Sequence, residues 1–203
     1  MDNFQFTLSQ AITNYNGNTP GRASNIELAA KKINGCILLP GEEFSCWDMV
    51  SPVTAEAGYQ PATVFEKGKR TVGIGGGVCQ VSSTIYNAQL KSGIPSKERH
   101  PHSHSVAYIP LGLDAAVASK SMDYRFQNTL PVPIKILVAA AGGTLLVEFK
   151  TETDINEGYS YEPFTFQAGK FENLEIWNTR LRTYFHDTFI EESSLHYGVY
   201  IVD

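Results

Sequence analysis

Cys79 stands where a glycine-rich segment, residues 72–77, runs into a helical pattern. The apolar residues of that pattern recur at helical spacing: Val78, Val81, Ile85 and Ala88. A thiol is a useful nucleophile only as a thiolate, and unpaired amides at a helix N-terminus stabilise that anion. The sequence therefore predicts Cys79 as a nucleophile in the first turn of a helix over residues 79–92.

The residues on either side of Cys79 fit the same chemistry. Gly75, Gly76 and Gly77 have no Cβ, so we expect them to let a substrate backbone approach the sulfur closely. The backbone N–H groups of Cys79 and Gln80 would face a developing oxyanion, and the Gln80 side chain is a further candidate donor.

A cluster of histidines follows about 20 residues later, in His100-Pro101-His102-Ser103-His104. An extended backbone points alternate side chains the same way, so the three imidazoles are predicted on one side of a strand. One of them is the candidate base for Cys79, and Asp114 or Asp123 is the candidate carboxylate that orients it. The order cysteine, histidine, aspartate resembles that of transglutaminase-like cysteine enzymes, by analogy of fold.

Other interpretations of these residues remain open. Cys79 is equally explained as a small buried hydrophobe, and a glycine-rich turn into a helix is also an anion site. A nucleotide is disfavoured because the phosphate-loop lysine is missing. The histidine cluster, with Cys79 or Asp114, is a candidate zinc site. Cys36 and Cys46 have no histidine nearby in sequence and are predicted to serve packing.

Composition excludes several classes of protein. The 203 residues carry a net charge of −5, which disfavours a nucleic-acid partner held by bulk electrostatics. No run approaches the roughly 18 to 20 apolar residues of a membrane span. The first residues lack the pattern of a secretory signal, so the sequence alone predicts a cytoplasmic chain or a fragment without its targeting segment. Three cysteines do not form a disulfide framework.

The composition changes near Thr151. Residues 151–203 hold 3 of the 16 basic residues, 10 of the 21 acidic residues and 11 of the 23 aromatic residues. A segment of this length makes a poor independent core. We therefore predict one domain over residues 1–150 and an acidic, aromatic-rich extension over 151–203 that packs on the same body.

Secondary-structure patterns favour an α+β fold. Ser24 and Glu27 match a capping box, which predicts a helix over residues 24–34 ended by Gly35. Two main helices, 24–34 and 79–92, would pack on a largely antiparallel sheet, with a β-rich aromatic C-terminal extension. The predicted strands cover residues 36–39, 62–65, 105–109, 124–126, 134–138, 144–149, 182–185 and 197–202, with a hairpin turn at Gly142-Gly143.

The chain resembles a known family in the string GIGGGVCQVSST, residues 73–84, and in Arg99-His100-Pro101-His102. This is similar to the signature of the VanW family, named from vancomycin-resistance gene clusters. The resemblance covers roughly residues 5–150 and includes Arg22-Ala23-Ser24-Asn25-Ile26 upstream and residues 123–128 downstream. It implies a bacterial protein of the cell envelope, often exported or membrane-anchored and sometimes beside peptidoglycan-binding modules, but no established activity.

The family pattern includes Cys79, Gln80, His100, His102 and Asp114, which we predict as catalytic. His104 departs from the pattern, so the resemblance favours His102 as the base, with His100 as the alternative, over a three-histidine zinc site. Further positions of the pattern are predicted to bind substrate: Gly75, Gly76, Gly77, Ser82, Ser83, Arg99 and Asp123. Arg99 would pair with a substrate carboxylate or a structural one.

Together these observations predict a Cys/His-dependent acyl transfer, as an amide hydrolase or a transpeptidase-like enzyme, without metal or cofactor. The predicted partner is a cell-wall peptide or peptidoglycan fragment. The alternatives are a non-catalytic module that binds a cell-wall peptide or carboxylate, and a zinc protein. The location predicted from the sequence alone is the cytoplasm, whereas the resemblance implies the cell envelope.

Overall fold

The computed structural model describes residues 3–66 and 69–202 of the chain. The elements in chain order are β1 (Phe6–Asn14), α1 (Pro20–Ile33), β2 (Cys36–Leu38), β3 (Glu43–Ser45), α2 (Cys46–Val50), β4 (Pro61–Glu66), β5 (Lys69–Ile74), α3 (Val78–Lys91), β6 (Ser96–Glu98), β7 (Arg125–Gln127), β8 (Ile134–Ala141), β9 (Thr144–Thr151), β10 (Tyr159–Phe171), β11 (Leu174–Phe185) and β12 (Thr188–Ile201). The predicted α+β class is confirmed.

A four-stranded antiparallel sheet, in the order β1-β9-β8-β2, carries α1 and α3 on one face. Strand alternation explains which face is covered, because every second residue of β8 and β9 is buried. The buried strand residues are Ile134, Ile136, Val138, Leu145, Val147 and Phe149. The α1 residues that meet this core recur at helical spacing: Ile26, Ala29, Ala30 and Ile33.

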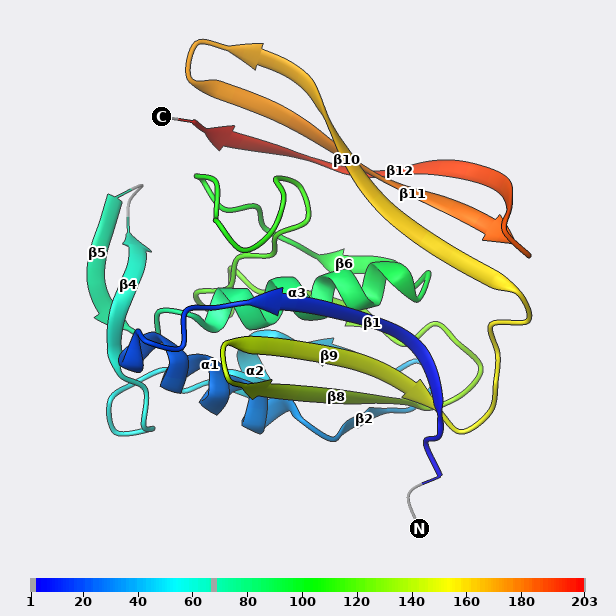
Figure 1. Ribbon diagram of the computed structural model, residues 1–203, viewed down its shortest axis with the longest axis horizontal. Helices are drawn as coiled ribbons and strands as arrows, with labels where there is room; N and C mark the ends of the chain where they lie inside the picture. The colour runs from blue at the N-terminus through cyan, green and yellow to red at the C-terminus, as the bar shows by residue number, and fades with distance from the viewer. Residues whose placement is uncertain (1–2, 67–68, 203) are drawn as a thin grey trace.

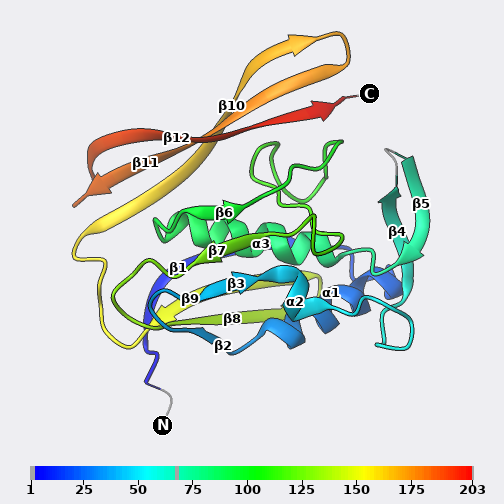
Figure 2. The same ribbon diagram turned by 180° about the vertical axis from the view of Figure 1, so that it is seen from behind.

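The helix α3 lies at the centre of the molecule. Figures 1 and 2 show α3 between the four-stranded sheet and the long three-stranded sheet β10-β11-β12. A smaller sheet, in the order β3-β7-β6, covers another side of α3. Twelve of the fourteen residues of α3 are therefore buried, including polar ones. The β4–β5 hairpin stands at one end of the molecule, beside the start of α3 (Figure 1).

Several predicted elements differ from the structure. The first helix begins at Pro20, with Thr19 as its N-cap, rather than at Ser24. Proline is favoured in the first turn because its fixed φ suits a helix and its missing N–H has no helical partner there. The strand predicted over 105–109 is wrong, because these residues form turns without a partner strand. The hairpin through Gly142-Gly143 is confirmed.

The sequence patterns missed β1 and β10 and predicted only the C-terminal parts of β11 and β12. β1 pairs with β9 along its length, and β10, β11 and β12 are each 12 to 14 residues long. Of the described residues, no helix combines the length and apolar character that crossing a membrane requires.

Candidate active site

The glycines before Cys79 set the start of α3. Gly77 is the N-cap and takes a φ of 119°, and Gly75 takes a φ of 87°. A Cβ at Gly75 would lie 2.2 Å from Val53 Cγ1, and one at Gly76 would lie 2.4 Å from the Thr63 carbonyl oxygen. All three glycines are buried. They permit close packing of the chain on itself, so the expected approach of a substrate along them is not what the structure shows.

Asn25 of α1 holds this glycine loop in place. Its amide Nδ2 donates to the carbonyl oxygens of Gln60 and Gly76, at 2.9 and 3.0 Å, and its Oδ1 accepts from Gln60 N–H at 2.7 Å. The side chain is fully buried. One asparagine thereby joins α1, the start of β4 and the loop that delivers Cys79, so the position of the thiol is fixed by three segments.

Cys79 is half-buried and lies beside His102. Its thiol donates to the Val117 carbonyl oxygen at 3.3 Å, and Val117 N–H lies 3.5 Å from the sulfur. Burial opposes ionisation of the thiol, but a hydrogen bond with His102 and the charges of His102 and Arg22 lower the pKa of Cys79 below its usual value. The interactions with His102 and Arg22 favour the thiolate, the form of cysteine that reacts.

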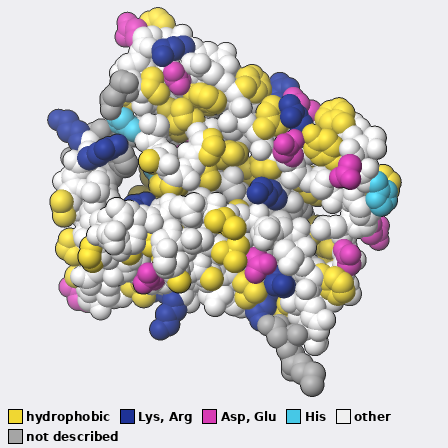
Figure 3. All heavy atoms as spheres, in the orientation of Figure 1, with side chains coloured by type: hydrophobic (Ala, Val, Ile, Leu, Met, Phe, Trp, Pro, Cys, Tyr) yellow, Lys and Arg dark blue, Asp and Glu magenta, His cyan; other side chains and the backbone are white. Residues whose placement is uncertain are grey.

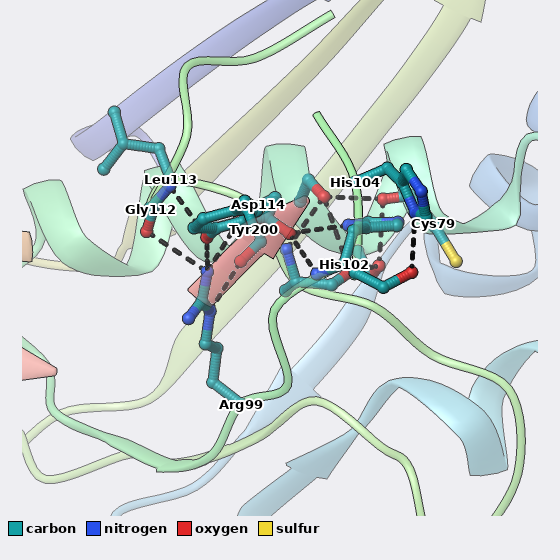
Figure 4. A network of polar contacts seen from close by, with 12 residues as sticks. Cys79, Arg99, His102, His104, Gly112, Leu113, Asp114 and Tyr200 are labelled. Carbon is teal, nitrogen blue, oxygen red and sulfur yellow. Dashed lines mark hydrogen bonds and ion pairs between the residues drawn. The ribbon is translucent and has the colours of Figure 1, made fainter. Parts of the chain in front are cut away.

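His102 interacts with both Cys79 and Asp114, and Figure 4 shows its contacts with Asp114. Its Nδ1 lies 2.6 Å from Asp114 Oδ2, and its backbone N–H donates to the same oxygen at 2.6 Å. Burial disfavours the imidazolium, yet the hydrogen bonds to Asp114 and Cys79 raise the pKa of His102 to about 9. The Nδ1–H therefore faces the carboxylate, and Nε2 remains for the thiol.

Asp114 is held ionised by buried partners. Arg99 Nη2 donates to Asp114 Oδ1 at 2.7 Å, and the Tyr200 hydroxyl donates to the same oxygen at 2.5 Å. Burial would raise the pKa of Asp114, but the hydrogen bond from His102 and the charge of Arg99 lower it to about 2. We predicted that Arg99 pairs with a substrate carboxylate or with a structural one. Its side chain is only 4% exposed and pairs with Asp114, which is the structural carboxylate.

Two serines of α3 support the loop that carries Asp114. The Ser82 hydroxyl donates to the Ala115 carbonyl at 2.6 Å, and Ser83 Oγ accepts from Ala115 N–H at 3.0 Å. Both serines are fully buried. We predicted that they bind substrate, but their hydroxyls fix the loop next to Cys79 and do not reach the surface.

Gln80 does not face the thiol as an oxyanion donor. Its Nε2 donates to Thr13 Oγ1 at 3.0 Å and to the Asn14 carbonyl at 2.9 Å, and its Oε1 accepts from Arg22 Nη2 at 2.8 Å. Its backbone N–H donates to the Gly77 carbonyl at 3.0 Å. The two backbone N–H groups that we predicted as oxyanion donors therefore differ. The Gln80 N–H is already bonded, whereas the Cys79 N–H donates to no acceptor among the described residues.

The other two histidines of the predicted cluster, His100 and His104, lie outside the group formed by Cys79, His102 and Asp114. His100 Nε2 pairs with Glu98 Oε1 at 2.8 Å on the surface, and His104 lies 3.0 Å from Ser103 Oγ. The three imidazoles do not share one side of a strand, because residues 101–104 form an irregular loop. In the part of the chain that the structure describes, no group of three or more His, Cys, Asp or Glu side chains is arranged to hold a metal ion.

Asp123 is buried at the β3–α2 corner rather than at the thiol. Its carboxylate accepts from Ser45 Oγ at 2.5 Å and from Trp47 N–H at 2.8 Å. These bonds occupy both oxygens and join the corner to the start of β7. The predicted substrate-binding role of Asp123 therefore has no support in its surroundings.

Sequence reasoning missed three residues of the site. Tyr200 comes from β12, 86 positions after Asp114, and neither charge nor spacing singles it out among ten tyrosines. Tyr108 packs edge-on against His102, with ring centroids 6.5 Å apart. The charge of Arg22 lowers the pKa of Cys79. Arg22 belongs to the segment 22–26 that resembles the VanW family, and this resemblance was the one signal in the sequence that pointed to it.

The fold and the site define an α+β protein with a buttressed cysteine–histidine–aspartate arrangement. The model of the VanW family, described as VanW like protein, matches residues 21–150. The chain belongs to the VanW family. The match includes Cys79, His102 and Asp114, whereas Tyr200 lies beyond it.

Two curated proteins are similar to this chain. The Bacillus subtilis protein YoaR, described as uncharacterized, is 38% identical over 149 residues, which cover 73% of this chain and 49% of YoaR. The vancomycin B-type resistance protein VanW of Enterococcus faecalis is 29% identical over 138 residues, which cover 61% of this chain and 50% of that protein. The chain spans about half the length of these relatives. No solved structure matches it.

Proposed function

We propose that this chain catalyses acyl transfer on peptide or amide bonds, with Cys79 as nucleophile, His102 as base and Asp114 as the group that orients the imidazole. The observation that carries the proposal is the continuous chain of contacts from the Cys79 thiol through His102 to the buried Asp114 carboxylate. A nucleophile, a base and an orienting group within hydrogen-bond reach are the general signature of nucleophilic catalysis.

The reaction then runs in two balanced steps. The Cys79 sulfur forms a bond to the carbonyl carbon, the carbon–nitrogen bond breaks, and His102 gives its proton to the departing amine. Water, or an acceptor amine in a transpeptidation, next attacks the thioester and gives its proton to His102. The carbon–sulfur bond breaks, and the Cys79 thiolate is regenerated beside protonated His102. The Cys79 N–H, which has no acceptor among the described residues, is the candidate donor to the oxyanion.

Asp114 stays ionised throughout these steps. With a pKa of about 2, it holds the negative charge that stabilises the His102 imidazolium. Arg99 and Tyr200 on its other oxygen fix its orientation. These contacts support an orienting role for Asp114, with the proton staying on the imidazole.

A cell-wall peptide is the substrate we propose. One curated relative is named for vancomycin resistance, and the family resemblance implies the cell envelope. The test is incubation of the purified protein with peptidoglycan fragments and mass spectrometry of the products. We expect cleaved or acyl-transferred stem peptides, with loss of all product for Cys79→Ala and a drop of at least about a hundredfold for His102→Ala.

The control is Cys36→Ser, because Cys36 lies on β2 at the far edge of the four-stranded sheet. It should leave the activity unchanged. Activity that survives both Cys79→Ala and His102→Ala would contradict the proposal. Binding of the fragments without conversion, equal in the wild type and Cys79→Ala, would favour the non-catalytic module instead.

A further inference from the structure

Arg22 is a half-buried cation beside the nucleophile. Its charge contributes to the lowered pKa of Cys79, and its Nη2 donates to Gln80 Oε1 at 2.8 Å. Gln80 is itself anchored to β1 by two hydrogen bonds, so the guanidinium has a fixed orientation. An arginine has five N–H donors, and the bond to Gln80 uses one of them.

Within residues 3–66 and 69–202, no carboxylate forms an ion pair with Arg22. Arg99, Arg125, Arg180 and Arg182, by contrast, each pair with a carboxylate. A charge taken partly out of water is costly unless it is paired. Arg22 therefore has N–H donors left for an anionic ligand, in addition to its electrostatic interaction with the Cys79 thiolate.

A second, independent observation comes from Tyr108. No hydrogen bond of ordinary length and angle reaches its buried hydroxyl oxygen from the described residues, and the Ser83 side chain is among its polar neighbours. The ring lies under the Arg22 guanidinium, 5.7 Å from its Cζ, and its electrostatic neighbours include Cys79. A buried hydroxyl without a partner is unfavourable, so an oxygen atom of a ligand at this point would restore the missing hydrogen bond.

A hollow in the surface lies at the end of the molecule that holds the β4–β5 hairpin and the start of α3 (Figures 1 and 3). Figure 3 shows a hollow between the β4–β5 hairpin and the rest of the molecule, above the N-terminal end of α3, with Lys and Arg side chains around it. A hollow lined by positive charge favours an anionic ligand over a neutral one.

We propose that Arg22 and Tyr108 form a carboxylate-binding subsite beside Cys79, so that the substrate is an acidic peptide with a carboxylate near the acyl group. The planar guanidinium matches the two oxygens of a carboxylate, and the tyrosine hydroxyl donates a third bond. This inference rests on the proposed function, in which Cys79 is the nucleophile.

The experiment compares two alkylating reagents of similar size, anionic iodoacetate and neutral iodoacetamide, at Cys79 of the full chain at neutral pH and low salt. The ratio of their rates cancels the thiolate fraction, because both react with the same thiolate. Relative to the same ratio for 2-mercaptoethanol, we expect a preference for iodoacetate of at least about tenfold, equal to about 1.4 kcal/mol.

Arg22→Gln should abolish this preference, Arg22→Lys should keep part of it, and Tyr108→Phe should reduce it. The matched control is Arg182→Gln, because Arg182 lies on β11 and pairs with Glu162 and Glu192. It should keep the full preference. A measurement on the wild type needs no variant: raising the salt concentration should slow iodoacetate and leave iodoacetamide unchanged.

Equal relative rates of the two reagents in the wild type, or a preference that survives Arg22→Gln, would overturn the subsite and leave Cys79 as a reactive thiol. No reaction of Cys79 with either reagent would overturn both the subsite and the proposed function. The two failures are thereby distinguished.

Discussion

Tyr200→Phe is the substitution that most sharply tests how β12 supports the site. The hydroxyl of Tyr200 donates to Asp114 Oδ1 at 2.5 Å and accepts from Arg99 Nη2 and Gly112 N–H, each at 2.8 Å. Phenylalanine keeps the ring and removes only this oxygen. The residue is fully buried, so water does not replace the lost bonds.

The magnitude follows from these three contacts. Two of them involve a charged partner, and such hydrogen bonds contribute about 1.5–3 kcal/mol each, against about 1 kcal/mol for the backbone one. They do not add fully, because Arg99 and Asp114 still pair with one another. We therefore expect the free energy of unfolding to fall by about 2–4 kcal/mol, which lowers the melting temperature by roughly 5–15 °C.

The assay is urea unfolding followed by circular dichroism and tryptophan fluorescence. Tyr197→Phe is the matched control, since Tyr197 lies on the same strand with 61% of its surface exposed. It should change the free energy of unfolding by less than about 0.5 kcal/mol. If Tyr200→Phe is as stable as Tyr197→Phe, the reasoning about the Asp114 network is wrong.

Two further outcomes follow from the site. The pKa of Asp114 is lowered from 3.8 to about 2, so its stabilising contribution is full above the unfolded value and disappears as the pH falls through the folded one. We expect urea unfolding to show a loss of about 2 kcal/mol between about pH 4 and pH 2, and Asp114→Asn to lack it. Gly77→Ala should destabilise the protein by more than about 2 kcal/mol, because φ is 119° and the added Cβ would lie 2.9 Å from Ile26 Cγ1. Gly35→Ala, with nothing within 4 Å, should cost only about 1 kcal/mol in the same unfolding assay.

Local patterns predicted the parts of the site that lie close together in the chain. The glycines and the helical spacing after Cys79 placed the thiol in the first turn of α3, and the hairpin of β8 and β9 followed from Gly142-Gly143. We predicted that the glycines admit a substrate, but a missing Cβ permits close approach of any group, including another part of the same chain. At Gly76 the approaching group is the backbone of β4.

Local sequence patterns could not predict the contacts between segments that lie far apart in the chain. Whether Arg99 binds a substrate or a structural carboxylate depends on burial, and β12 completes that burial about 100 positions later. Gln80 had the expected type and place for an oxyanion donor, but β1 captures its amide through Thr13. Sequence patterns gave no hint of β1 as a strand, so this capture could not be foreseen.

The pH dependence of Cys79 alkylation by iodoacetamide tests the central claim most directly, with mass spectrometry to separate Cys79 from Cys36. In the wild type, Cys79 should react with an apparent pKa below its ordinary 9.0, and His102→Ala should move it upward. Burial and the charge of Glu42 raise the pKa of Cys36, so Cys36 should titrate above Cys79. A Cys79 that stays inert across this range, or that titrates identically with and without His102, would contradict the account.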